Sequence, residues 1–405
     1  MSRRSFSRGL VPLMALVALV SVSFAPPARA EDTITTQPYV DLLNLGALKE
    51  LGISGKGITI ALIDGPVDTS APELQGADIT TVTPCPYTPT PDSIFHGTAM
   101  ASLLVSPDYG IAPGAKILHY AIPFGDEEFT QEDRRCSTSY ALMLRRALDD
   151  EADIISLSLG ELLEIGPWMT MDAELTRADL DGVIIVAAMG NNNREDYAGS
   201  YASSNLSVGV AATDIHGNRA DYSNYGKGTT IALYGGPVST RDYPSGRIYH
   251  ETKGTSVATA LTSGYLALAM EKWPEATNRQ ILQSLVRTAA RGDGVEWDPG
   301  YGYGLANLRG LLTEDPTNLP DENPLLHKND EWAPSEDFYN DYIDGLLDPG
   351  DEVITDPHYI YRGSNSSRAR LTPEKTAYGT SPRYHRAPNT PPTPPPNRHH
   401  HTPQK

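Results

Sequence analysis

Residues 254–270 read GTSVATALTSGYLALAM, and the interpretation of the whole chain depends on this stretch. The run from residue 257 to residue 270 is apolar on nearly every helical face, which predicts a helix that is buried all round. Ser256 stands at its first turn, where unpaired backbone N–H groups and the positive end of the helix dipole meet. A serine at this position is either an ordinary helix cap or a nucleophile. The choice depends on whether the chain also supplies a base, an orienting acid and an oxyanion donor.

Short β-branched runs alternate with longer helical patterns between residues 57 and 312. This alternation predicts an α/β fold with three layers, in which a mostly parallel sheet carries helices on both faces. The expected strands are apolar nearly throughout, as strands buried on both sides should be. The expected strands are residues 58–63, 116–122, 153–159, 183–188, 206–212 and 230–234. The expected helices are residues 97–105, 138–151, 172–181, 257–272 and 278–290, the last with Thr277 and Gln280 as a capping box.

Polar residues stand where functional sites form in such sheets, at the carboxyl ends of the strands. Asp64 directly follows the strand at residues 58–63, and Asn191 follows the strand at residues 183–188. His96 begins a helical stretch that is rich in small residues. Taken singly, these are ordinary loop, cap or turn residues. Together with Ser256 they supply an acid, a base, an amide donor and a nucleophile.

Asp64, His96 and Ser256 follow one another in the chain order of subtilisin. The segments around them resemble the subtilisin-like serine proteases over residues 57–312, which is 256 of the 405 residues. The matching motifs are IALIDG at 60–65, HGT at 96–98, SLG at 158–160, AAMGN at 187–191, GTSVA at 254–258 and GYGLAN at 302–307. Within the family, HGTAMA at 96–101 and GIAPGAK at 110–116 look most like the mycosins, the actinobacterial proteases attached to type VII secretion.

The resemblance implies a serine endopeptidase that hydrolyses peptide bonds through an acyl-enzyme. Ser256 is then the nucleophile, His96 takes and returns its proton, and Asp64 holds the imidazole. Asn191 and the backbone N–H of Ser256 would hold the oxyanion.

The same resemblance suggests how a substrate is held. Ser158, Leu159 and Gly160 resemble the segment that pairs with the substrate backbone as an added strand. Gly199 either lies at the base of the first specificity pocket or is an ordinary loop residue.

Two departures from the family pattern bear on the site. Gly65 stands where a hydroxyl residue often supports the aspartate, so the orientation of Asp64 is expected to be less well supported. The connection from Val105 to Gly110 is short and lacks the longer loop that holds a structural calcium in many relatives. We therefore predict no metal and no cofactor.

The N-terminal residues predict export. Residues 1–30 combine a basic start with Arg3, Arg4 and Arg8, an apolar stretch and the cleavage site Ala28-Arg29-Ala30, which together are typical of a secretory signal. No later run is long enough for a transmembrane helix, so we expect an exported chain that is secreted or associated with the cell envelope. Residues 31–56 form an N-terminal extension in place of a full prodomain. In an exported protein, Cys85 and Cys136 favour a disulfide over two free thiols.

Residues 313–405 form a Pro-rich tail in which residues 313–356 carry a net charge of −13 and residues 357–405 a net charge of +7. This composition predicts a disordered or semi-extended tail. The net charge of −19 argues against a nucleic-acid partner. The expected partners are a polypeptide substrate and, from the mycosin-like motifs, a type VII secretion component. Two alternatives remain: a mycosin-like scaffold with little proteolysis, or a leader-peptide maturation protease, which the run DGPVD at 64–68 resembles.

Overall fold

A parallel sheet forms the centre of the protein, with strands in the order β2-β3-β1-β4-β5-β6-β7. A computed structural model describes residues 33–82, 87–123, 140–158, 168–195, 200–292, 296–326 and 328. The strands are β1 (Thr59–Asp64), β2 (Ile79–Val82), β3 (Lys116–Ala121), β4 (Ile154–Leu157), β5 (Ile184–Ala188), β6 (Ser207–Thr213) and β7 (Thr229–Tyr234). Each neighbouring pair is parallel, so all the carboxyl ends lie at one edge.

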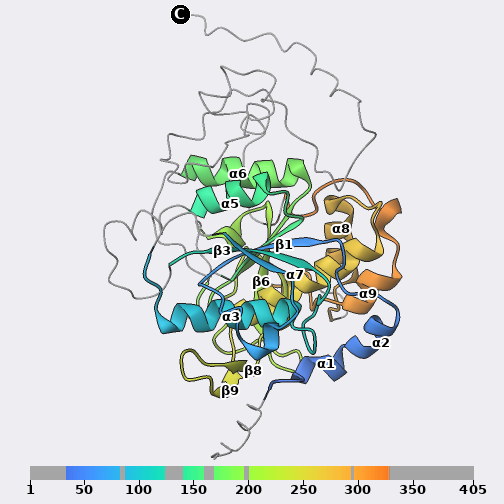
Figure 1. Ribbon diagram of the computed structural model, residues 1–405. Helices are drawn as coiled ribbons and strands as arrows, with labels where there is room; N and C mark the ends of the chain where they lie inside the picture. Colours follow the sequence, from blue (N-terminus) through green and yellow to red (C-terminus); the bar gives the residue numbers. More distant parts are fainter. Residues whose placement is uncertain are drawn as a thin grey trace, which may run out of the picture. The chain divides into compact units, whose positions relative to one another are not determined.

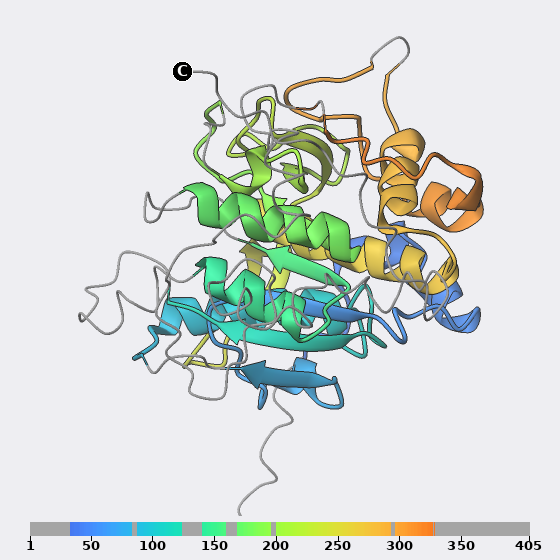
Figure 2. The ribbon, with the colours of Figure 1, turned by 90° about the horizontal axis from the view of Figure 1, so that it is seen from above.

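Helices cover both faces of this sheet (Figure 1). Helices α3 (Pro91–Val105) and α7 (Thr255–Lys272) lie on one face, and α5 (Tyr140–Asp149) and α6 (Trp168–Asp181) lie on the other. Alternate side chains of β1 enter the two resulting cores: Ile60 and Leu62 pack on the α3 and α7 side, whereas Ala61 and Ile63 belong to the opposite core. The predicted three-layer α/β fold is therefore confirmed, and Figure 2 shows the same layers from above.

Helix α7 is buried from Thr255 to Met270, as its sequence predicts. Helix α8 (Asn278–Thr288) begins with the predicted capping box, in which Thr277 and Gln280 exchange both hydrogen bonds. Helix α3 differs from the prediction because it begins at Pro91 rather than at residue 97. Thr90 caps it by accepting a hydrogen bond from the Ser93 backbone, and proline is well suited to a first helical position. His96 consequently lies inside the helix rather than at its start.

Several short elements were not predicted, because their sequences lack a sustained apolar period. Strand β2 reads Ile-Thr-Thr-Val and is partly exposed at the sheet edge. The unpredicted α-helices and strands are α1 (Pro38–Leu42), α2 (Leu45–Glu50), α9 (Leu308–Thr313) and the antiparallel hairpin of β8 (Val238–Arg241) and β9 (Ile248–Thr252). Short 3-10 turns form at Pro72–Leu74, Tyr201–Ser203 and Pro316–Asn318.

The segment before β1 packs along the body. Tyr39 is fully buried and donates a hydrogen bond of 3.1 Å from its hydroxyl to the Tyr109 carbonyl. The Gln37 side chain bonds the Ser239 backbone in both directions, at 2.7 and 2.9 Å. These polar and apolar contacts fix the N-terminal extension from Ile34 onward against α3 and β8.

The packed body continues past residue 312, where the sequence placed the start of the tail. Leu325 is fully buried in the core on the α3 and α7 side, and Asn205 donates to the carbonyl of Leu326. The Lys328 ammonium donates to the carbonyl of Ala202 at 2.9 Å. Residues 313–326 and Lys328 belong to the packed body because they bury a leucine and satisfy backbone carbonyls of it. The predictions for residues 1–30, for Cys85 and Cys136 and for the remaining tail lie outside the described residues.

The helices in the described ranges include none that is both long and apolar enough to cross a membrane.

Leu325 and Leu326 form a matched pair for testing this C-terminal segment. Leu325 is fully buried, so Leu325→Ala should lower the free energy of unfolding by about 2–5 kcal/mol. Leu326 is 39% exposed, and Leu326→Ala should change that free energy by less than about 0.5 kcal/mol. Urea denaturation of both variants measures the difference. Equal stabilities of the two variants would show that residues 313–328 are not part of the folded body.

Candidate active site

Asp64 ends β1 with its side chain fully buried. Its Oδ1 accepts two hydrogen bonds, one from the Gly65 backbone N–H at 2.7 Å and one from His96 Nδ1 at 2.7 Å. Its Oδ2 is also buried and has no hydrogen-bond partner in the part of the chain that the structure describes. A carboxylate oxygen cannot donate, so the contact fixes the His96 tautomer with the proton on Nδ1. One carboxylate oxygen therefore supports both the turn after β1 and the imidazole.

Two opposing effects act on the pKa of His96. Burial lowers the pKa of His96, whereas the charge of Asp64 and the hydrogen bond to it raise the pKa, and the net direction is upward. The side chain keeps 25% of its surface exposed, while that of Asp64 has none. The imidazole is therefore anchored at its inner nitrogen and still reaches solvent.

Helix α3 approaches β1 very closely beside His96. A Cβ atom on Gly97 would lie only 2.0 Å from the carbonyl oxygen of Gly65, so no side chain fits there. This contact explains why a small residue follows His96 in the sequence. The close approach sets the distance between the helix that carries His96 and the strand that carries Asp64.

Ser256 lies in the first turn of α7 and is 8% exposed. Its hydroxyl donates to the Ser158 carbonyl at 3.0 Å, and the Ser158 hydroxyl donates in return to the Ser256 carbonyl at 3.4 Å. No hydrogen bond joins Ser256 to His96, both of which are described. In this resting arrangement the acid and the base are in contact, and the hydroxyl is directed at the end of β4.

Asn191 follows β5 and is held by the residue that precedes Ser256. Its Oδ1 accepts from the Thr255 backbone N–H at 2.8 Å and from the Thr255 hydroxyl at 3.1 Å. Both contacts are donated to Asn191, which fixes the amide with its oxygen toward Thr255 and its nitrogen away from it. Asn191 Nδ2 makes no hydrogen bond within the described ranges, and the residue is exposed. The amide N–H group is thus oriented and available.

Sequence reasoning missed two residues that shape this loop. Thr255 was read only as part of the serine motif, although its place beside Ser256 could have marked it. Asn224 gave no signal, because it is distant in sequence. Its side chain donates to the Met189 carbonyl and accepts from the Asn192 N–H, both at 2.9 Å. Gly190, between them, has a φ of 100°, which favours glycine, and this bend turns Asn191 toward α7.

The remaining predicted substrate-binding residues divide into two groups. Ser158 lies beside Ser256 at the end of β4, as the two hydrogen bonds show. Leu159, Gly160 and Gly199 lie outside the described residues.

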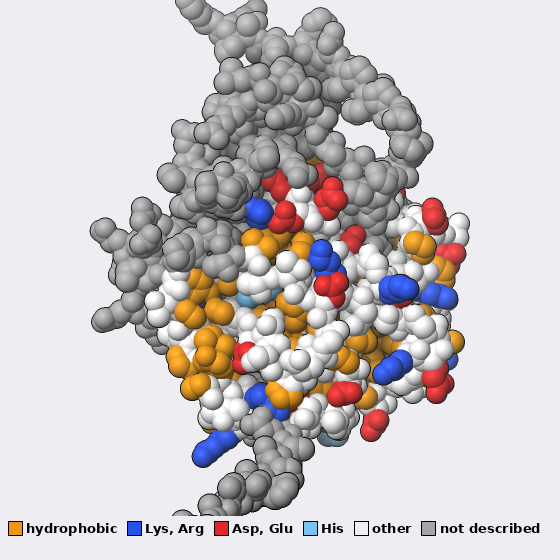
Figure 3. Space-filling view, in the orientation of Figure 1, with side chains coloured by type: hydrophobic (Ala, Val, Ile, Leu, Met, Phe, Trp, Pro, Cys, Tyr) orange, Lys and Arg blue, Asp and Glu red, His pale blue; other side chains and the backbone are white. Residues whose placement is uncertain are grey.

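The β8–β9 hairpin contacts α3, the helix that carries His96, and is followed in the chain by α7, the helix that carries Ser256. The ring of Phe95, next to His96, meets the ring of Tyr249 edge-on at a centroid distance of 6.4 Å. Tyr249 is 52% exposed, and β9 ends four residues before Ser256. Figure 3 shows hydrophobic side chains gathered on this side of the face, over α3 and the hairpin. The surface beside the candidate site is therefore apolar.

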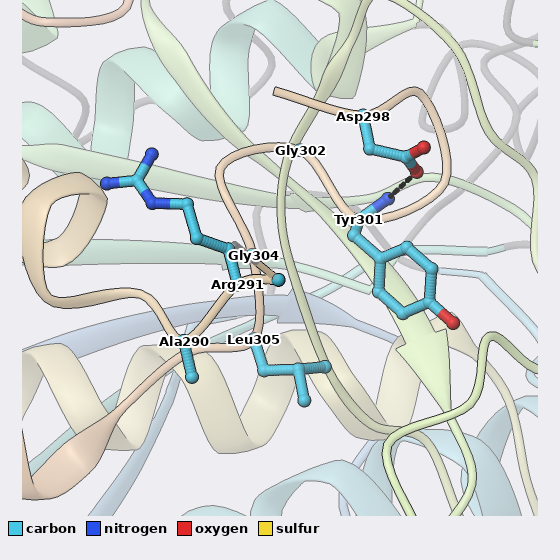
Figure 4. Close-up of a pocket in the computed structure, with 8 residues that line it drawn as sticks. Ala290, Arg291, Asp298, Tyr301, Gly302, Gly304 and Leu305 are labelled. Carbon is cyan, nitrogen blue, oxygen red and sulfur yellow. Dashed lines mark hydrogen bonds between the residues drawn. The ribbon is translucent and has the colours of Figure 1, made fainter. Parts of the chain in front are cut away.

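A separate cavity of about 450 Å³ lies between the end of α8 and the last turns before α9 (Figure 4). Its described lining consists of Ala290, Arg291, Gly292, Asp298, Tyr301, Gly302, Gly304 and Leu305. The Tyr301 backbone donates to Asp298 at 3.1 Å at its rim. None of these is a predicted site residue, so the cavity is distinct from the cluster around Asp64.

Because burial and the charge of Asp64 act in opposite directions on the pKa of His96, removing that charge should lower this pKa. Asp64→Asn leaves burial in place and removes the charge, so the pKa of His96 should fall from above to below its ordinary value of about 6.5. NMR titration of the imidazole C–H signals, assigned with His96→Gln, measures this change. His119, whose pKa is lowered by burial, should titrate below the ordinary value in both proteins. An unchanged His96 pKa would mean that Asp64 does not control the ring.

This chain is similar in sequence to known proteins over most of its length. The model of the subtilase family matches residues 55–304. Subtilisin BL from Lederbergia lenta is 32% identical over 266 residues, which cover 63% of this chain and 91% of that protein. Subtilisin E from Bacillus subtilis (strain 168) is 27% identical over 297 residues, covering 69% and 72% of the two chains.

Solved structures share the fold. The prenylagaramide maturation protease PagA is 26% identical with a TM-score of 0.54, over 66% of this chain and 97% of PagA. MycP1, without its N-terminal propeptide, is 22% identical with a TM-score of 0.56, over 71% and 98% of the two chains. At that identity MycP1 shows a shared fold alone. The family match covers more than half of the 405 residues, and the chain belongs to the subtilase family as a subtilisin-like serine peptidase.

Proposed function

We propose that Asp64, His96 and Ser256 are the catalytic triad of this serine peptidase. The observation that carries the proposal is the 2.7 Å contact between His96 Nδ1 and the fully buried Asp64 carboxylate. A buried carboxylate on the inner nitrogen orients the ring and stabilises its protonated form without taking the proton itself. The outer nitrogen is then the one that exchanges a proton with Ser256.

The chemistry begins with an exchange of hydrogen bonds at Ser256. The hydroxyl gives up its bond to the Ser158 carbonyl and donates to His96 Nε2. His96 takes the proton as Oγ attacks the carbonyl carbon of the peptide, and returns it to the leaving amine as the C–N bond breaks. Water attacks the resulting ester by the same route, which regenerates the Ser256 hydroxyl and releases the acid.

Asn191 serves as the oxyanion donor in this proposal. Its amide is fixed by two hydrogen bonds from Thr255, so its N–H group needs no reorganisation when negative charge develops. The backbone N–H of Ser256 lies at the start of α7, where the helix dipole favours negative charge. Two preoriented donors next to the nucleophile are what acyl transfer requires.

The substrate class is a polypeptide that pairs with the end of β4. Ser158, Leu159 and Gly160 would bind its backbone as an added strand, and Gly199 would lie at the base of the first specificity pocket. The described residues on the face in Figure 3 mix acidic and basic side chains, which is consistent with a partner other than nucleic acid.

We also propose that the peptidase acts outside the cytoplasm, from the signal-like residues 1–30. Cys85 and Cys136 would form a disulfide there. The mycosin-like motifs support a type VII secretion component as a partner, and MycP1 is similar in fold. Fractionation of cells for the mature protein separates release from attachment at the envelope.

A second candidate function is the maturation of a modified peptide by leader removal. The structural similarity to PagA, which is named as the prenylagaramide maturation protease, favours it. Mass spectrometry of the products of a peptide that carries a leader distinguishes the two functions: leader removal gives one cut at the end of the leader, whereas general proteolysis gives cuts at several sites.

The nucleophile assignment predicts the behaviour of Ser256→Ala. Wild type should react with a fluorophosphonate probe and cleave a peptide ester, and Ser256→Ala should lose at least about 10³-fold in both. Ser263→Ala, which removes a fully buried hydroxyl from the same helix, is the matched control and should keep full labelling. Equal labelling of wild type and Ser256→Ala would refute the assignment.

If Asn191 is the oxyanion donor, removing the Thr255 hydroxyl that holds its amide should slow catalysis. Thr255→Val removes the hydroxyl bond to Asn191 and the one from Gly190, so kcat should fall about fivefold, equivalent to about 1 kcal/mol, while KM stays nearly constant. Thr262→Val removes a threonine hydroxyl that bonds the Ala258 carbonyl in the same helix, and should leave kcat unchanged. Steady-state kinetics of both variants test this difference.

A further inference from the structure

His119 is a second histidine close to Asp64, and the mechanism above does not use it. It lies in β3 and is fully buried. It pairs in register with Leu62 of β1 and Thr81 of β2. Its neighbour Tyr120 belongs to the core on the α5 and α6 side, so His119 faces the opposite layer, which contains α3. The ring thus lies between the sheet and the helix that carries His96.

Both nitrogens of His119 are engaged in a way that defines its tautomer. Nε2 is 2.9 Å from the Gly65 carbonyl, which can only accept, so Nε2 carries the proton. Nδ1 is 3.2 Å from the Thr81 hydroxyl and accepts from it. Burial lowers the pKa of His119, in agreement with a neutral ring that donates on one side and accepts on the other.

The Gly65 peptide that His119 holds is the support of the Asp64 carboxylate. Its N–H donates to Asp64 Oδ1 at 2.7 Å, and its carbonyl oxygen contacts the backbone of Gly97, directly after His96. Gly65 has no side chain with which to fix this turn, and Asp64 Oδ2 has no hydrogen-bond partner among the described residues. Apart from the contact with His96, the orientation of the carboxylate therefore depends on the position of the Gly65 peptide unit.

We propose that His119 is a positioning residue for catalysis: its Nε2–H fixes the Gly65 carbonyl, and through the Gly65 N–H it fixes the carboxylate of Asp64 that orients His96. It replaces, from a neighbouring strand, the support that a hydroxyl at residue 65 would give. The inference rests on the proposed catalytic role of Asp64 and His96, and it assigns His119 no contact with substrate.

Two substitutions of His119 test whether its Nε2–H donor matters or only the space that the ring fills. His119→Gln places an amide N–H at nearly the reach of Nε2, and should keep kcat within about threefold of wild type. His119→Met fills similar space without a donor, so the Gly65 turn loosens and kcat should fall about 10- to 100-fold with little change in KM. Tyr120→Phe removes a buried hydrogen bond from the opposite face of the same strand and should leave kcat unchanged.

A double-mutant cycle with Asp64→Asn distinguishes positioning from a general loss of stability. If His119 acts through Asp64, His119→Met should cost less than about threefold in the Asp64→Asn background, because the interaction that it supports is already lost. The rates are measured as fluorophosphonate labelling, with thermal unfolding of each variant followed in parallel. Equal losses of rate in both backgrounds, or full activity of folded His119→Met, would overturn the proposal.

Two further outcomes keep the test decisive. If His119→Met does not fold, Thr81→Val takes its place: it leaves the ring but removes the donor to Nδ1, and should lower kcat about threefold only when Asp64 is present. If wild type itself does not react with the probe in a manner that depends on Ser256, the proposed function fails, and that result is separate from any effect at His119.

Discussion

The arrangement of this site follows from one buried carboxylate. Asp64 is removed from water at the end of a parallel strand, and an ionised group in that position is costly unless donors reach it. The two donors that reach it come from its own turn, through the N–H of Gly65, and from His96. To bring the imidazole within 2.7 Å, α3 must approach β1 so closely that residue 97 has no room for a Cβ atom. The contact between His96 and Asp64 therefore determines together how β1 and α3 are placed and why residue 97 is glycine.

The sheet brings the other groups to the same place. Parallel strands present their carboxyl ends at one edge, so Asp64 after β1, Ser158 after β4 and Asn191 after β5 come together although they are far apart in sequence. Helix α7 lies beneath β4 to β7 and delivers Ser256 and Thr255 to this edge. Because α7 is buried on every side, its first turn cannot shift without disturbing the core. Ser256 and the support of Asn191 are thus fixed by the packing of a single helix.

The sequence predicts the elements that bury apolar surface and misses those that do not. Helix α7 and the inner strands were predicted because their apolar residues are continuous, and the three-layer fold followed from their alternation. Strand β2, with two threonines at the sheet edge, and the β8–β9 hairpin have no such pattern. Asp64, Asn191 and Ser256 were predicted from their places at strand and helix ends, whereas His96, expected at a helix start, lies inside α3. Asn224 and His119 were missed because each acts on backbone distant in sequence, and a polar residue within a chain segment gives no indication of which carbonyl it will meet.

The same physical reasoning explains why His96 is only partly buried. A carboxylate beside the ring raises its pKa, and a pKa far above neutrality would leave the imidazole protonated and unable to accept a proton from Ser256. Burial acts in the opposite direction, since it disfavours the charged form. Full burial without the carboxylate would give a neutral ring, and nothing would stabilise the positive charge that the ring gains when it accepts a proton. Full exposure would let water screen the carboxylate, so the protonated ring would lose part of its stabilisation. The proposed general base needs both influences at once, and His96 lies within α3 with its inner nitrogen on Asp64 and part of its side chain exposed.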